Sequence, residues 1–118
     1  MKTFLALALA FALWANAGPA TAEVVLINTF EVPEGEQQAA IAAWKVARDF
    51  LAKQPGYIST ALHGAVTPNA RFALINVAKW KDQETFMAAT QAMRDAKIFE
   101  PPEGVIANPA LYTVVATD

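Results

Sequence analysis

The amino-acid sequence predicts an α+β fold in which a four-stranded antiparallel sheet carries two helices on one face. Four segments have the β-branched composition or the period-two alternation of strands. Two others repeat their apolar residues with the 3.6-residue period of a helix. Along the chain these segments follow the order β-α-β-β-α-β, which is the order of a ferredoxin-like domain.

The expected strands are bounded by turn-forming residues. Segment 67–70, Thr-Pro-Asn-Ala, is a turn, so the second and third strands should form a hairpin. Pro101, Pro102 and Pro109 predict an irregular loop before the last strand, which could serve as a lid over a pocket. The four strands are expected at 23–31, 57–66, 71–80 and 111–117.

Two helices are expected, at 36–53 and 83–97. Pro33 and Gly35 precede the first helix, and Pro55 ends it. Asp82 is a predicted N-cap, because its carboxylate can accept hydrogen bonds from the first turn of the second helix. The apolar stripe of the first helix is interpreted as core and consists of Ala40, Ala43, Trp44, Ala47, Phe50 and Leu51.

Residues 1–22 have the anatomy of a secretory signal peptide. Lys2 supplies the positive charge, and the apolar run from Phe4 to Trp14 is shorter than the roughly 20 residues that span a bilayer. Ala20-Thr21-Ala22 matches an A-x-A cleavage site and is preferred to Ala15-Asn16-Ala17, after which Pro19 would follow the cut closely. The alternative is an uncleaved anchor. We therefore expect a secreted or periplasmic protein whose single domain covers 23–118, with no membrane association after cleavage.

Composition excludes several function classes. The chain has 9 basic and 11 acidic residues and no basic run, which argues against nucleic-acid binding. It has no cysteine and one histidine, so disulfides, thiolate chemistry and a zinc site are excluded. No metal site is predicted.

The third strand is apolar on both faces, which predicts that both faces are covered. Two helices can cover only one face of the sheet, so a second copy of the chain is expected on the other. We therefore predict a homodimer joined through its sheets. One face carries Phe72, Leu74, Asn76, Ala78 and Trp80, and the other carries Ala73, Ile75, Val77 and Lys79.

Asn76 is the polar exception on its face of this strand. A buried carboxamide without partners costs about 1–3 kcal/mol, so Asn76 either bonds neighbouring backbone or binds a ligand. A buried strand that carries one amide and one indole and runs directly into a helix is a plausible wall of a small-molecule pocket.

The sequence resembles the antibiotic biosynthesis monooxygenase family, whose members form dimeric α/β barrels. The resemblance covers nearly all of 23–118. The resemblance rests on short motifs and single residues that occur in a fixed order: Asn28, Pro33-x-Gly35, Pro55-Gly56-Tyr57, Leu62-His63, Arg71-Phe72, Asn76, Trp80, Phe86 and Leu111-Tyr112.

The resemblance implies a cofactor-independent monooxygenase. In that type an Asn and a Trp four positions apart on the third strand line the pocket, and Asn76 and Trp80 match this spacing. The implied partners are a small aromatic or quinol-type molecule and O₂, without metal or flavin. The deprotonated substrate would reduce O₂, while the protein orients it and excludes water. Asn76 would donate a hydrogen bond to a substrate oxygen, and Trp80 would form a flat wall.

Five further residues are candidates for substrate contact: Asn28, His63, Phe72, Phe86 and Tyr112. His63 could be a general base, because its unperturbed pKa lies near 6.5, although a half-exposed hairpin residue is the simpler interpretation. Asn28 and Asn76 could be structural amides, and Trp80 could be ordinary core.

Two other functions stay open. The first is a non-catalytic dimeric domain that binds small ligands on the same fold. The second is haem degradation, which resembles this chain at Asn28 but fits less well. The helix Trp of that branch aligns with Ala89, and its haem-ligating His falls near Phe99.

The cleavage site predicts that the exported protein begins at Glu23. Intact-mass analysis of the protein recovered after export should show the loss of residues 1–22. A mass that still includes Met1 to Ala22 would contradict this prediction.

Overall fold

The computed structural model describes residues 22–118 and contains six elements in the predicted order. The predicted signal peptide falls almost entirely on residues 1–21, which lie outside this range. Within residues 22–118, no helix has the length and apolar character needed to cross a membrane. The elements are β1 (Val24–Glu31), α2 (Gln37–Leu51), β2 (Tyr57–Gly64), β3 (Leu74–Trp80), α3 (Gln83–Ala96) and β4 (Ile106–Tyr112).

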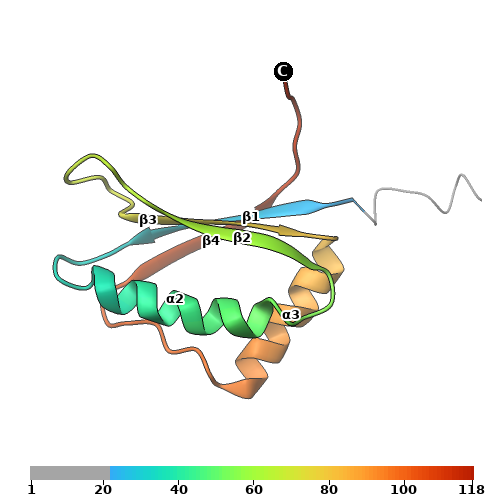
Figure 1. Cartoon of the computed structure of the whole chain (residues 1–118), viewed down its shortest axis with the longest axis horizontal. Coiled ribbons are helices and arrows are strands. Elements are labelled where there is room, and N and C mark those ends of the chain that lie inside the picture. The colour runs from blue at the N-terminus through green and yellow to red at the C-terminus, as the bar shows by residue number, and fades with distance from the viewer. Residues whose placement is uncertain (1–21) are drawn as a thin grey trace, which may run out of the picture.

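The four strands form one sheet in the order β2-β3-β1-β4. Every neighbouring pair is antiparallel. Both helices lie on the same face of the sheet, as Figure 1 shows. The predicted ferredoxin-like fold is therefore confirmed, with β1 and β3 in the centre and β2 and β4 at the edges.

The core lies where α3 meets the end of β3. Trp80 is 1% exposed and is the largest fully buried side chain in residues 22–118. The rings of Tyr57 and Phe86 each pack edge-on against it, with centroids 5.6 Å away. Val24, Leu26, Ala78 and Ala89 complete this cluster. The aromatic contacts join the two strands of the hairpin, β2 and β3, to the start of α3.

A β-bulge interrupts the pairing of β2 with β3. Tyr57 pairs with Trp80, but the next pair is Ser59 with Lys79, so Ile58 is an extra residue on β2. The extra residue reverses the alternation of side chains beyond it. Thr60 therefore shares a sheet face with Tyr57, although three positions separate them in the sequence.

The third and fourth strands differ most from the sequence-based prediction. The third strand begins at Leu74, because residues 71–73 still belong to the bend that follows the hairpin turn. The last strand was predicted at 111–117, but β4 covers Ile106–Tyr112 and contains Pro109. A proline that lacks the N–H donor is tolerated here because β4 is an edge strand and pairs only with β1.

Beyond β4, residues 113–118 form no regular element. This tail leaves the sheet on the side opposite the helices (Figure 1). Val114 is 69% exposed and Val115 is 95% exposed. An apolar tail on that side lies near the sheet face that the helices leave open.

The N-terminus of α3 is closed by Asp82, as predicted. Its Oδ1 accepts a hydrogen bond from the Thr85 backbone N–H at 2.8 Å, and the Thr85 hydroxyl donates to the Asp82 carbonyl oxygen at 3.2 Å. Hydrogen bonding of the carboxylate to Thr85, led by its backbone N–H, together with the nearby Lys81 charge lowers the pKa of the Asp82 carboxyl below its usual range. The cap fixes the direction in which the chain leaves β3.

Replacing Asp82 by Ala should lower the melting temperature at neutral pH, and Asp82→Asn, which keeps an acceptor, should lower it less. Because the folded-state pKa is depressed, the carboxylate stabilises the protein above about pH 3.9, the unperturbed Asp value, and this contribution is lost as pH falls through the folded-state pKa. Thermal melts should therefore show the gap between wild type and Asp82→Asn narrowing below about pH 4. A gap that is independent of pH would contradict a charged cap.

Candidate functional site

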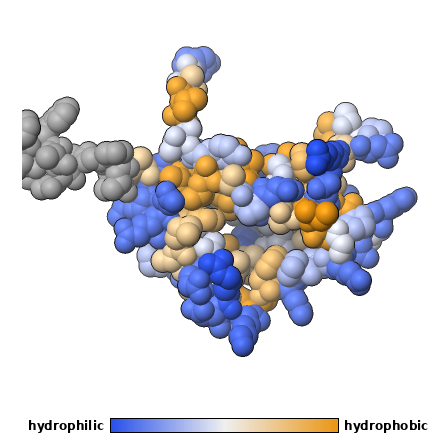
Figure 2. All heavy atoms as spheres, turned by 180° about the vertical axis from the view of Figure 1, so that it is seen from behind, coloured by the Kyte–Doolittle hydropathy of each residue, from blue (hydrophilic) through white to orange (hydrophobic). Residues whose placement is uncertain are grey.

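A cavity of about 830 Å³ lies between the inner face of the sheet and the two helices. This volume falls within the range of small-molecule sites. The segment after α3 forms one wall through Phe99, Pro101, Pro102 and Val105. Figure 2 shows the surface hollowed between the sheet and the helical layer, with apolar residues along the border.

The sequence creates this space through small residues on α2. Ala40, Ala43 and Ala47 face the sheet and line the cavity. The methyl group of an alanine does not fill the space between helix and sheet that a larger side chain would occupy. The helical stripe that was interpreted as core therefore packs only partly, and its alanines form one wall of the site.

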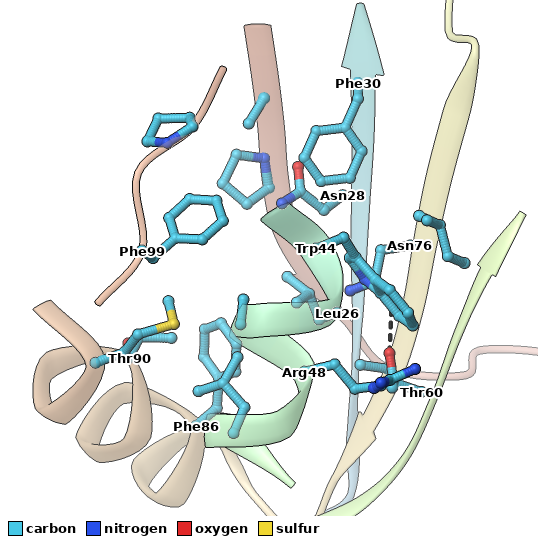
Figure 3. A pocket seen from close by; sticks show the side chains of 18 of the residues that line it. Leu26, Asn28, Phe30, Trp44, Arg48, Thr60, Asn76, Phe86, Thr90 and Phe99 are labelled. Carbon is cyan, nitrogen blue, oxygen red and sulfur yellow. Dashed lines mark hydrogen bonds between the residues drawn. The ribbon is translucent and has the colours of Figure 1, made fainter. Parts of the chain in front are cut away.

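Most of the remaining lining is apolar and aromatic, including Leu26, Phe30, Trp44, Phe86 and Phe99. Figure 3 shows these side chains arranged around one space, with Asn28, Thr60, Asn76 and Arg48 among them. Such a site favours a flat apolar molecule and places a few polar groups to fix its orientation.

Asn28 and Asn76 lie directly opposite each other on β1 and β3. Both line the cavity. Opposed residues on antiparallel strands have Cβ atoms about 4.5–5.5 Å apart, so the two carboxamides act at neighbouring points of one ligand. Pro109 flanks Asn28 on the other side and provides no N–H.

The two carboxamides differ in their hydrogen bonds. Asn76 is 8% exposed, and its Oδ1 accepts a hydrogen bond from the Thr60 hydroxyl at 2.7 Å. The Oδ1 of Asn28 is buried and has no partner among residues 22–118. An unpaired buried carbonyl oxygen costs about 1–3 kcal/mol. Such a cost is expected at a binding site rather than in a structural amide pair.

Arg48 brings a positive charge to the cavity wall. Its guanidinium carbon lies 5.3 Å from the Trp44 ring centroid, one turn earlier on α2. It also pairs with Asp49 at 2.9 Å, but both side chains are substantially exposed, so this pair adds little to stability. Arg48 and Trp44 together present a cation and a flat aromatic surface to a ligand.

The cavity brings together four of the seven residues predicted from the sequence. Asn28, Asn76, Trp80 and Phe86 line it. Trp80 lies at its floor, held in the aromatic cluster with Tyr57. Their catalytic or binding roles stay predictions.

His63, Phe72 and Tyr112 are not among the lining residues. His63 pairs with Ile75, and Tyr112 pairs with Val25, so both belong to the sheet face opposite the helices. Phe72 precedes β3, and its ring centroid lies 5.2 Å from the Arg71 guanidinium carbon. The bulge at Ile58 explains why His63 lies on the face opposite the helices, because strict alternation from Tyr57 would have turned its side chain toward them.

Sequence reasoning missed three residues of the site. Thr60 could not be assigned to a face without the bulge, and Trp44 was interpreted as core. Arg48 does not belong to the apolar stripe predicted for the first helix, so it was not a candidate. The signal available for Trp44 and Arg48 was the row of alanines beside them, which leaves room next to large side chains.

The lining residues found in 22–118 include no histidine, aspartate or glutamate. General-base catalysis by an imidazole or a carboxylate therefore has no group in this cavity. Within the same range, no group of three His, Cys, Asp or Glu residues is placed to hold a metal ion. What the arrangement can do is bind, orient and desolvate a flat molecule that carries oxygen substituents.

The haem-degrading type was tested against the same geometry. Its helix Trp position is Ala89, which is 2% exposed and packed in the core. Its ligand position is near Phe99, which lines the cavity but cannot bind iron. His63 lies on the opposite sheet face, so no imidazole in residues 22–118 reaches the cavity. The residues present therefore do not supply the expected axial ligand.

Comparison with known proteins agrees with this fold. The family model described as antibiotic biosynthesis monooxygenase matches residues 23–96. A crystal structure of a candidate monooxygenase from Shewanella loihica PV-4 is 48% identical, with a TM-score of 0.75, and the match covers 81% of this chain and 97% of that one. Among curated proteins, no match to this sequence is found.

More distant structures share the fold. SnoaB, a cofactor-independent oxygenase from Streptomyces nogalater, is 22% identical with a TM-score of 0.62, covering 81% of this chain and 96% of SnoaB. The haem degrader MhuD from Mycobacterium tuberculosis is also 22% identical, with a TM-score of 0.63, covering 80% of this chain and 98% of MhuD. The family match and the 48% identity reach beyond the fold: this chain belongs to the antibiotic biosynthesis monooxygenase family.

Proposed function

We propose that the protein is a cofactor-independent monooxygenase that oxidises a small aromatic or quinol-type molecule with O₂. The observation that carries this proposal is the apolar cavity with two opposed carboxamides on its wall, to which residues 22–118 contribute no histidine, aspartate or glutamate. Family membership and the likeness to SnoaB, a cofactor-independent oxygenase, support it.

In this reaction the substrate supplies the electrons. A phenolate or hydroquinone anion reduces O₂, one oxygen atom forms a bond to a ring carbon, and the O–O bond breaks so that the second atom leaves as water. The ring carbon is oxidised and its C–H bond breaks, and this hydrogen together with the phenolic proton leaves in the water, so that the phenol and O₂ give a quinone and one water molecule. The protein contributes orientation and a dry site rather than an acid–base pair. Asn76 donates to the oxygen on which negative charge resides, and Arg48 adds a nearby positive charge.

The alternative is a non-catalytic domain that binds the same class of molecule. It would use the same cavity, and the fold does not decide between the two. The unpartnered Asn28 oxygen favours a ligand in either case. Turnover is therefore the measurement that separates them.

Oxygen uptake with a panel of naphthalene and benzene hydroquinones, in buffer treated with chelator, should exceed the uncatalysed rate. Asn76→Ala should lower this rate about a hundredfold, because one donor at a developing oxyanion contributes about 3 kcal/mol. Val66→Ala, at a 98% exposed hairpin position, is the matched control and should not change turnover. Full activity of folded Asn76→Ala would remove this residue from the site, and binding without oxygen uptake would favour the non-catalytic domain.

We further propose that the protein acts outside the cytoplasm, after removal of residues 1–22. The support is the sequence of that segment, with its charged start, apolar run and A-x-A site. The substrate would then be a molecule that reaches the periplasm or the surroundings of the cell.

We also propose that the protein works as a homodimer joined through the open sheet face. Val25, Ile27, Ile75 and Val77 form an apolar patch on that face, and no other element of residues 22–118 covers it. The exposed tail of residues 113–118 leaves the sheet on the same side, where it can contact a second copy (Figure 1). Apolar patches of this kind are commonly subunit interfaces.

Light scattering at micromolar concentration should give twice the mass of the processed chain. Val77→Glu places a charge in the centre of the open sheet face and should shift the protein toward monomer. Val66→Glu, in the exposed hairpin turn, is the matched control and should stay dimeric. A wild-type monomer at every concentration would refute the dimer.

A further inference from the structure

The two opposed carboxamides of the cavity are held differently, and this difference has a chemical consequence. We propose that Thr60 is a positioning residue that turns the Asn76 carboxamide so that its amino group faces the ligand, which makes this point of the cavity selective for a deprotonated phenol. The inference rests on the proposed function only in taking the cavity as the site for an aromatic ligand.

Thr60 and Asn76 share a direct hydrogen bond between their side chains. The Thr60 hydroxyl donates to the Asn76 Oδ1 at 2.7 Å, a short and partly buried bond between neighbouring strands (Figure 3). A carboxamide has one acceptor side and one donor side. With its oxygen held by Thr60, Asn76 is left with its two N–H donors for a ligand.

Asn28 provides the contrast within the same cavity. Its carbonyl oxygen has no hydrogen-bond partner within residues 22–118, so no bond from this part of the chain fixes which way the carboxamide turns. Asn28 can therefore adapt to a ligand oxygen that donates or accepts. The Asn76 oxygen is instead bonded to Thr60, and turning this carboxamide over would require the Thr60 hydroxyl to change from donor to acceptor. In the arrangement that the structure shows, Asn76 therefore offers a ligand oxygen its N–H donors.

The bulge on β2 is what makes the contact possible. Ile58 is the extra residue, and beyond it Thr60 lies on the cavity face, diagonal to Asn76 across the β2–β3 pair. Without the reversal, strict alternation from Tyr57 would place Ser59 and Ala61 on this face instead. The hydroxyl beside Asn76 is therefore a product of backbone geometry that a regular strand would not give.

A donor held toward the ligand stabilises the charged form of a bound phenol. An N–H of the Asn76 carboxamide can donate to a phenolate oxygen, whereas a carbonyl oxygen in the same place would favour the protonated phenol. The pKa of a bound phenol should accordingly be lower than in water. Removing the Thr60 hydroxyl frees the carboxamide, and part of that shift should disappear.

The test is a pH titration of 4-nitrophenol and 4-nitro-1-naphthol bound to saturating full-length protein, followed by phenolate absorbance. Wild type should lower the pKa of the bound phenol. Thr60→Val should raise it again by roughly 0.5–1 unit, the equivalent of one neutral hydrogen bond. Thr60→Ser keeps the hydroxyl and should retain the wild-type value.

Two further variants separate positioning from folding. Thr29→Val makes the same change on β1, at a position that alternates away from Asn28 and does not line the cavity, and should leave the bound pKa unchanged. Asn76→Leu removes the donor itself and should raise the bound pKa at least as much as Thr60→Val. Melting temperatures measured in parallel identify any variant that is not folded.

Several results would overturn the proposal. One is a wild-type pKa equal to that in water, and another is failure of both phenols to bind. A shift lost in Asn76→Leu but kept in folded Thr60→Val would show that Thr60 does not orient the amide. Oxygen uptake is measured separately, so a Thr60-dependent shift without turnover refutes the monooxygenase and leaves this inference intact.

Discussion

The structure depends on the way Trp80 is packed. Its indole fills the junction between the sheet and the start of α3, with Tyr57 and Phe86 edge-on against it. Farther from this junction the helical layer meets the sheet through alanines of α2, which are too small to close the gap. The space between the sheet and the helices is thus filled by side chains around Trp80 and left as a cavity beside the alanines of α2. A more evenly distributed core would give a more stable domain of this size and no binding site.

The cavity is built at some expense to stability. A carboxamide on each central strand interrupts two rows of apolar residues, and one of them leaves a carbonyl oxygen unpaired. Pairing Asn76 with Thr60 reduces this cost on β3, while β1 carries it uncompensated. A hydrogen-bond donor placed at the Asn28 oxygen would remove this cost, so stability is given up at a point that faces the cavity.

The sequence predicted the fold because each element is locally consistent: β-branched strands, helical apolar stripes, the Asp82 cap and the Pro55-Gly56 stop. The site was predicted where alternation is regular, as for Asn28 on β1 and Asn76 on β3. The prediction failed at His63, because a bulge changes which face a side chain occupies and cannot be detected from hydrophobic periodicity. The boundaries of β4 were missed because Pro109 is a breaker in most contexts but not on an edge strand.

The bulge also bears on how relatives of this chain are aligned. Because Ile58 occupies no place in the ladder, a chain that lacks this one residue can keep Tyr57, Thr60 and Asn76 in the same spatial relation. A gapless alignment that starts from the Pro-Gly turn would then be out of register by one position along β2. It would match the cavity hydroxyl of one protein with an outward-facing side chain of the other. Homology along this strand is therefore better counted backwards from the hairpin turn, where the pairing is unbroken.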